Sequence, residues 1–95
     1  MATVVYGDFE WDDAKSASNM EKHEVSFEEA AHALVEDATA LDVADAVDPN
    51  RINSLAMSAR ARILYVVSIE VGPRLRILSA RRATKHERRI YADRS

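Results

Sequence analysis

The 95-residue sequence contains no cysteine, and it contains only two glycines and two prolines. The lack of cysteine excludes a disulfide scaffold, a zinc site with thiolate ligands and a cysteine nucleophile. With so few glycines, the chain has no Gly-rich phosphate-binding loop of the Walker or dinucleotide type. No apolar run approaches the roughly 18 residues that a transmembrane helix needs, and residues 1–13 lack the basic and apolar regions of a signal peptide. We therefore expect a cytoplasmic protein with no membrane partner, whose residues 1–95 form a single domain.

The charged residues are unevenly distributed along the chain. Residues 1–47 hold two basic and twelve acidic side chains, whereas residues 48–95 hold eleven basic and four acidic ones. Ten of these eleven bases are arginine, whose guanidinium group can bind a phosphate through two parallel hydrogen bonds. The basic half is therefore expected to meet an RNA or DNA phosphate or an acidic protein. The alternative is that the two halves neutralise each other within the fold.

Hydrophobic spacing and capping residues predict the element order β-α-α-β-β-β-β-α. Two capping boxes, Ser26 with Glu29 and Thr84 with Glu87, mark the starts of the second and third helices. Because several strands follow one another without intervening helices, we expect an antiparallel sheet and an α+β fold. The most apolar run, 63–67, should be a central strand covered on both faces. The predicted elements are a strand over 4–11, helices over 13–22 and 27–37, strands over 39–43, 52–57, 62–69 and 74–80, and a C-terminal helix from residue 85.

Arginine 81 stands out because of its place in the last predicted strand. Strict alternation puts Leu75, Ile77, Ser79 and Arg81 on one face, which we expect to be the core-facing one. A charge at the end of such a row requires a bound anion or an ion pair. The sequence leaves two partners of Arg81 open: a bound phosphate, and a carboxylate from the acidic N-terminal half.

A second candidate lies at the end of the first predicted helix, where Lys22 and His23 are adjacent. The partial negative charge of a helix C-terminus favours a protonated imidazole, which suits acid–base chemistry near neutral pH. A surface pair that merely caps the helix is the simpler alternative. Glu28, His32 and Glu36 share one helix face at four-residue intervals and could bind a divalent metal, but a solvated face explains them better, since a fourth ligand and a known ligand spacing are lacking. We predict no metal site and no cofactor.

Three blocks of residues resemble the BrnT family of bacterial type II toxins, which includes uncharacterised members grouped as a domain of unknown function. The first block is FEWD at 9–12, followed by Lys15, Asn19, Lys22 and His23. The second is VSFEEA at 25–30, and the third is RILSARRA at 76–83, followed by Glu87 and Tyr91. Their order and separation, in a chain of about this size, make the resemblance specific.

The resemblance implies a RelE-like fold, in which a small antiparallel β-sheet is flanked by two N-terminal helices and one C-terminal helix. It also implies a ribonuclease toxin that is neutralised by a BrnA-like antitoxin with a ribbon-helix-helix DNA-binding domain. Such a toxin would meet operator DNA only indirectly, through the antitoxin. Matched to the family motifs, the catalytic residues would be Lys22, His23 and Arg81. Weaker candidates for binding RNA phosphate or the antitoxin are Arg51, Arg82, Glu87 and Tyr91.

The expected reaction is cleavage of an RNA substrate without a metal ion. The ribose 2′-hydroxyl would attack, His23 or Lys22 would transfer protons, and Arg81, helped by Arg51 or Arg82, would stabilise the charge on the phosphate. The sequence departs from the family pattern at Glu24, which replaces the usual glycine after Lys-His, and this change costs about 1 kcal/mol if the left-handed turn is kept. The alternative function is a catalytically weak or inactive module that binds the antitoxin and acts in operon autoregulation.

Overall fold

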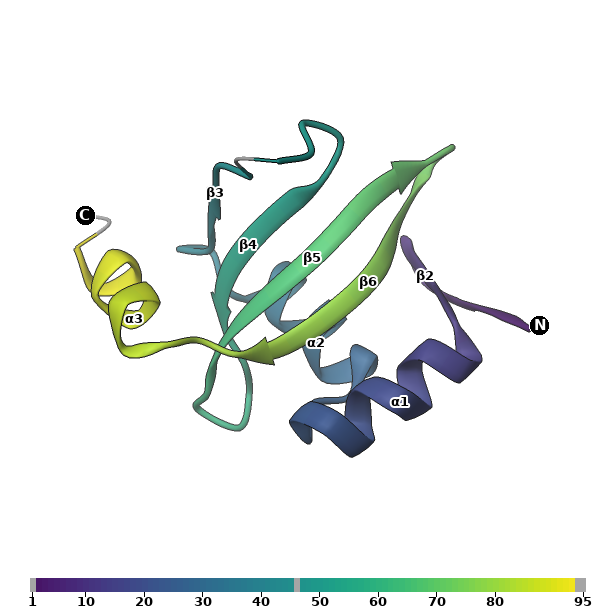
Figure 1. Cartoon of the computed structure of the whole chain (residues 1–95), viewed down its shortest axis with the longest axis horizontal. Coiled ribbons are helices and arrows are strands. Elements are labelled where there is room, and N and C mark those ends of the chain that lie inside the picture. Colours follow the sequence, from purple (N-terminus) through teal and green to yellow (C-terminus); the bar gives the residue numbers. More distant parts are fainter. Residues whose placement is uncertain (1, 46, 94–95) are drawn as a thin grey trace.

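The computed structural model of the chain describes residues 2–45 and 47–93. In this part of the chain, three helices and six strands form an α+β fold, with two helices near the N-terminus and one near the C-terminus, as predicted. The helices are α1 (Asp13–His23), α2 (Phe27–Glu36) and α3 (Lys85–Ala92), and the strands are β1 (Thr3–Tyr6), β2 (Phe9–Asp12), β3 (Leu41–Val43), β4 (Ile52–Met57), β5 (Ile63–Val71) and β6 (Arg74–Arg82). The sheet has the order β1-β2-β6-β5-β4-β3 (Figure 1).

The N-terminal segment is a hairpin instead of the single predicted strand over 4–11. Tyr6 lies opposite Phe9, and the connecting Gly7 has φ +62°, a left-handed conformation that glycine adopts without strain. β2 lies between β1 and β6, and all four of its residues are buried. Gly7 therefore ends one strand and starts a turn.

β2 and β6 run parallel, so the sheet is mixed and not wholly antiparallel as expected. Phe9 lies opposite Leu75, and the Leu75 N–H donates to the carbonyl oxygen of Asp8 at 2.9 Å. The expectation of an antiparallel pair was wrong here because two helices (α1 and α2) and three strands (β3, β4 and β5) separate β2 from β6 in the chain. A connection of this length, unlike a hairpin, leaves the direction of the returning strand free.

The main core lies between the sheet and the helices α1 and α2. Trp11 and Phe27 meet edge to face with ring centroids 5.9 Å apart, and both are almost fully buried. Phe27 starts the apolar stripe of α2, and the Ser26 hydroxyl caps that helix by accepting from the Glu29 N–H at 3.0 Å. Val35, near the end of α2, does not join this core and is 68% exposed. From the sheet, the core receives Leu64, Val66, Ile77 and Ala80.

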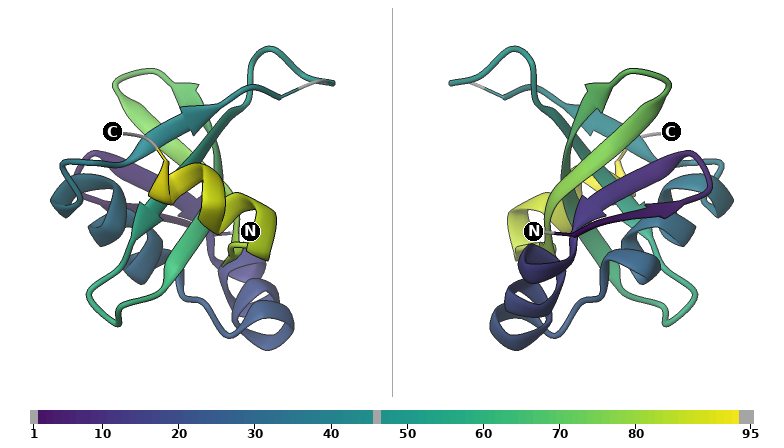
Figure 2. Two further views of the ribbon diagram at one scale, coloured as in Figure 1. Left: turned by 90° about the vertical axis from the view of Figure 1, so that its left-hand side faces the viewer. Right: turned by 90° about the vertical axis from the view of Figure 1, so that its right-hand side faces the viewer.

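A smaller apolar cluster lies on the opposite face of the sheet, beneath α3. Tyr91 from α3 packs there with Leu55 and Tyr65 from the strands. In both views of Figure 2 the strands lie between α2 and α3. β5 is an interior strand, as predicted, but its residues on the α3 side are only half-buried because α3 covers a limited part of that face. Within the described residues, no helix has the length and apolar character needed to span a membrane.

Candidate active site

A β-bulge in β6 decides where Arg81 points. The pairing with β5 shifts at Leu78, which lies between Ile77 and Ser79 and has no residue opposite. The shift exchanges the faces of the residues that follow, so that Ala80 is fully buried in the main core. Arg81, like Ser79, therefore points toward the side that carries α3. The expectation that Arg81 ends a core-facing row was wrong because that row assumed uninterrupted alternation.

Arg81 is held by two neighbours on the α3 side. Its Nη1 and Nη2 atoms donate to Oε1 and Oε2 of Glu87 at 2.7 and 2.9 Å, and its guanidinium lies over the Tyr65 ring, 4.3 Å from the centroid. The hydrogen bonds raise the pKa of Arg81 and lower the pKa of Glu87. The ion pair considered from the sequence therefore exists, but its partner is Glu87 and not an acid of the N-terminal half.

One edge of the Arg81 guanidinium stays open. A guanidinium has five N–H donors, and Nη1 uses its second one on the Arg82 carbonyl at 3.2 Å. In the described part of the chain, no hydrogen bond engages Nε–H or the second Nη2–H. These two groups form one fork, which is the geometry that binds two phosphate oxygens. The Arg81 side chain as a whole is 35% exposed.

Lys22 and His23 lie in the last turn of α1, beside a cleft of about 240 Å³. Ser79 lines the same cleft, and it precedes Arg81 by two residues on one face of β6. Arg81 itself is not among the described residues that line the cleft. Among the described residues, no hydrogen bond or ion pair joins Arg81 to Lys22 or His23.

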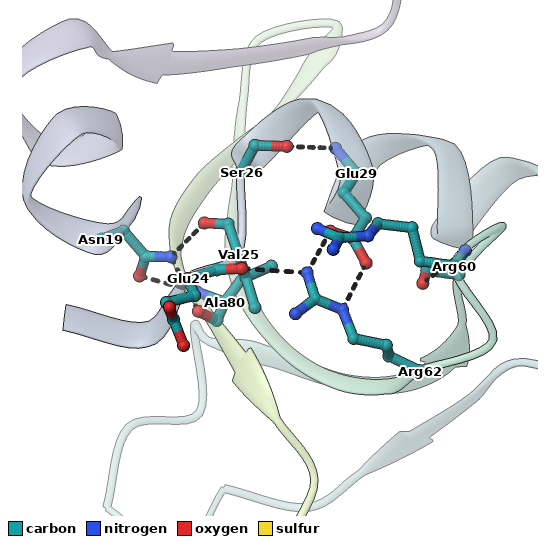
Figure 3. Close-up of polar contacts among 9 residues, drawn as sticks. Asn19, Glu24, Val25, Ser26, Glu29, Arg60, Arg62 and Ala80 are labelled. Atoms are coloured by element: carbon teal, nitrogen blue, oxygen red, sulfur yellow. Dashed lines mark hydrogen bonds and ion pairs between the residues drawn. The ribbon is translucent and has the colours of Figure 1, made fainter. Parts of the chain in front are cut away.

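Asn19 joins the helix that carries His23 to the strand that carries Arg81. Its Nδ2 donates to the carbonyl oxygens of Val25 and Ala80 at 2.9 and 2.8 Å, and its Oδ1 accepts from the Ala80 N–H at 3.1 Å (Figure 3). The amide thus pairs with Ala80 as the backbone of a neighbouring strand would. We did not single out Asn19 from the sequence, although an asparagine within a helix and inside a motif block was a usable signal.

The turn after His23 is fixed by a second polar group. Glu24 adopts the left-handed conformation (φ 57°, ψ 32°) that the family's glycine would take without strain. The Arg62 guanidinium donates to the Glu24 carbonyl at 3.0 Å and forms a two-point pair with Glu29 (Figure 3). Burial alone would raise the pKa of Glu29, but the bonds from Arg62 and other neighbours outweigh it and lower the pKa. This pair ties the α1–α2 turn to the β4–β5 hairpin.

The weaker candidates lie in different places. Arg51 lies just before β4 with its Nε 3.7 Å from Asp48, away from the α1 cleft. Tyr91 is buried, and its hydroxyl donates to Asp37 at 2.5 Å, a placement that suits packing of α3. Arg82 is exposed and lines a pocket at the start of α3. The structure therefore brings Arg81 and Glu87 together, and Tyr91 packs with Tyr65, the ring that Arg81 stacks on. Arg51 lies apart from them.

The α2 face that carries Glu28, His32 and Glu36 makes other contacts. His32 Nε2 lies 2.6 Å from the Tyr6 hydroxyl, and His32 Nδ1 lies 3.6 Å from Glu36. Within residues 2–45 and 47–93, no three His, Asp or Glu side chains are grouped closely enough to hold a metal ion.

Comparison with known proteins identifies the family. A family model described as the ribonuclease toxin BrnT of type II toxin–antitoxin systems matches residues 11–87. The chain belongs to the BrnT toxin family. This confirms the resemblance noted in the sequence, and the matched BrnT segment contains Lys22, His23, Arg81 and Glu87. No curated protein matches the chain.

A solved structure supports the BrnT fold. The crystal structure of the ribonuclease toxin BrnT from Brucella abortus aligns with a TM-score of 0.63 and 23% sequence identity, covering 79% of this chain and 94% of that chain. At this level of identity the match shows a shared fold. The six-stranded sheet with its three helices is therefore a BrnT-type architecture.

Proposed function

We propose that this BrnT chain is an endoribonuclease that cleaves RNA without a metal ion, at the edge of β6. The observation that carries the proposal is the double hydrogen bond between Asn19 and Ala80. It fixes the end of α1, with His23 one turn beyond Asn19, beside the strand residue that precedes Arg81. In this proposal, the acid–base group at the end of α1 and the Arg81 fork act on one phosphate from two sides of this strand edge.

The proposed reaction starts with the ribose 2′-hydroxyl of the RNA. Its oxygen attacks the adjacent phosphorus, and the bond from phosphorus to the 5′-oxygen of the next nucleotide breaks. His23 or Lys22 takes the proton of the 2′-hydroxyl, and the other of the two gives a proton to the leaving 5′-oxygen. The products are a 2′,3′-cyclic phosphate and a free 5′-hydroxyl, and no further reactant is needed. Proton transfer by a positioned histidine contributes about 10²–10⁴ in rate.

Arg81 would stabilise the negative charge that develops on the phosphate oxygens. Its open Nε–H and Nη2–H fork is oriented in advance, because Glu87 and Tyr65 hold the guanidinium in place. Glu87 is accordingly a positioning residue that acts through Arg81. Since Lys has no planar fork, we expect Arg81→Lys to restore little activity.

The finer features of the system belong to the same proposal. The partner is a BrnA-like antitoxin with a ribbon-helix-helix domain, and it docks over the arginine-rich α3 side of the sheet and covers Arg81. Operator DNA is met only through this antitoxin, and the complex works in the cytoplasm. Co-expression of the chain with the neighbouring open reading frame tests the partner, because a stable complex should co-purify. A chain that stays alone beside that product would refute this part of the proposal.

The test of the reaction is cleavage of purified total RNA in the presence of EDTA. Wild type should cleave, whereas His23→Ala and Arg81→Ala should lose at least about 10²-fold in rate. Two exposed residues of α3 supply matched controls, His86→Ala and Arg89→Ala, which should cleave like wild type. Circular dichroism must show that every variant is folded. Full cleavage by folded Arg81→Ala would remove Arg81 from the site, and loss of activity in EDTA would refute the metal-free reaction.

One observation favours the alternative of an inactive antitoxin-binding module. Glu24 places a carboxylate directly after His23, in a left-handed turn where glycine is the better residue. If wild type cleaves no RNA but binds the antitoxin at nanomolar concentration, the alternative holds. Glu24→Gly would then be the first variant to assay for recovered cleavage.

A further inference from the structure

A pocket lined by three arginines lies between the β4–β5 hairpin and the start of α3. Its volume is about 270 Å³, and its lining consists of Met57, Ala61, Arg62, Ile63, Arg82 and Arg88. Among the described residues, no acidic side chain lines it. Positive charges that gather around one hollow without a carboxylate in its lining favour a bound anion.

The three guanidinium groups are engaged to different degrees. Arg62 is nearly buried and is fixed by its pair with Glu29, so it forms a rigid wall. Arg88 donates from Nη1 to the Ala83 carbonyl at 3.0 Å, which leaves its other N–H groups for a ligand. Arg82 is exposed, and its guanidinium makes no hydrogen bond or ion pair with the described residues. Arg82 and Arg88 therefore supply the uncompensated charge of this arginine pocket.

A second hollow lies between the arginine pocket and the end of α1. It shares Arg62 and Arg82 with the pocket, and its far side is formed by the end of α1, next to His23. Two carboxylates, Glu21 and Glu24, line that side. Arg60 also lines this hollow. Because the two acids repel a phosphate, an anion is better placed in the arginine pocket, whose charged lining residues are all arginines.

We propose that the arginine pocket binds a backbone phosphate of the RNA, next to the phosphate that is cleaved. The inference rests on the proposed function, since it assumes an RNA chain that passes the end of α1. Arg81 and Arg82 are consecutive in β6 and point to opposite sides. An RNA strand that curves around the end of this strand therefore meets Arg81 at one phosphate and Arg82 at another. Met57 and Ile63 offer apolar surface to the attached ribose or base.

The test is the salt dependence of RNA binding. The probe is a fluorescein-labelled uridine oligonucleotide with 2′-O-methyl riboses, which cannot be cleaved through the 2′-oxygen. Its affinity is measured by fluorescence anisotropy over about 50–200 mM salt. For single-stranded nucleic acid, each phosphate neutralised by the protein contributes about −0.7 to the slope of log K against log salt. Arg82→Gln should flatten the slope by about 0.7 and weaken binding about tenfold at low salt, the loss expected for one charge-assisted hydrogen bond.

Arg89→Gln is the matched control, because Arg89 is an exposed arginine of α3 outside the arginine pocket. It removes the same charge and should leave the slope close to that of wild type. If Arg82→Gln and Arg89→Gln change the slope equally, the effect is net charge alone and the pocket is refuted. If Arg82→Gln weakens antitoxin binding and leaves RNA binding unchanged, the pocket belongs to the protein interface and the proposal is equally refuted.

The outcome is separable from that of the cleavage assay. A wild-type chain that binds the probe with an Arg82-dependent slope but cleaves no RNA would support the arginine pocket and refute the enzyme. If wild type cleaves RNA and Arg82→Gln binds the probe like wild type, the enzyme is supported and the arginine pocket is refuted.

Discussion

Replacing Asn19 by alanine should destabilise the protein by about 2–5 kcal/mol, a large share of the roughly 5–15 kcal/mol typical of a domain. The substitution removes three hydrogen bonds, whose distances are 2.8–3.1 Å. It leaves the Ala80 N–H and two carbonyl groups unpaired in a buried position, and each such group costs about 1–3 kcal/mol. The better helix propensity of alanine returns only about 0.6 kcal/mol.

Urea denaturation followed by circular dichroism measures this loss, with Asn50→Ala as control. Asn50 is exposed in the connection before β4, so its substitution should change the free energy of unfolding by less than about 0.5 kcal/mol. Amide hydrogen exchange adds a local readout, because the Ala80 amide should lose protection more than its neighbours in β6. A loss of stability below about 1 kcal/mol for Asn19→Ala would show that these bonds do not hold α1 against β6.

Three further predictions concern stability. Glu24→Gly should raise the free energy of unfolding by up to about 1 kcal/mol, because Glu24 has a left-handed φ of 57°. Glu21→Gly, inside α1, should lower it by about as much. If thermal melts show that both variants are stabilised or both are destabilised, the prediction is contradicted. Phe27→Ala should cost about 3–5 kcal/mol and Val35→Ala under about 0.5 kcal/mol, and similar melts for both would mean that the buried face of α2 is misassigned. The ion pair with Arg81 lowers the pKa of Glu87 in the folded protein, so the carboxyl of the unfolded chain binds protons more readily and stability should fall as pH drops below 4.5. In denaturation measured across this pH range, the stability of Glu87→Gln should fall less steeply than that of wild type. An equally steep fall would contradict the stabilising role of the pair.

The local elements of the fold could be predicted because their signals are local. The capping boxes predicted at Ser26 and Thr84 mark the starts of α2 and α3 correctly. The three long strands follow the predicted ranges within a few residues. The β1–β2 hairpin was missed because a lone Gly7 in an apolar stretch fits a strand interior as well as a turn. The parallel junction of β2 with β6 depends on tertiary packing, on which the local pattern carries no information.

The candidate site was predictable as residue types but not as geometry. Lys22, His23 and Arg81 were selected from motifs, and the structure places the first two beside a common cleft. The face to which Arg81 points depends on one extra residue, Leu78, and alternation rules cannot locate a bulge. Its partner Glu87 lies six residues further along the chain, and the pairing needs the bend between β6 and α3. Asn19 was missed because its role depends on the backbone of a strand that is distant in the sequence.

The parallel pairing of β2 with β6 also sets the order in which a nascent chain can fold. Phe9 pairs with Leu75, and Asn19 hydrogen-bonds to Ala80, so neither contact can form until the ribosome has synthesised most of the chain. Closing loops of this length makes folding slower than that of a chain with local contacts. The last turn of α1, which carries Lys22 and His23, emerges early, but its anchor to β6 through Asn19 forms late. A chain arrested before β6 can form the bonds from Arg62 to Glu24 and Glu29, but it lacks Ala80, the strand partner of Asn19.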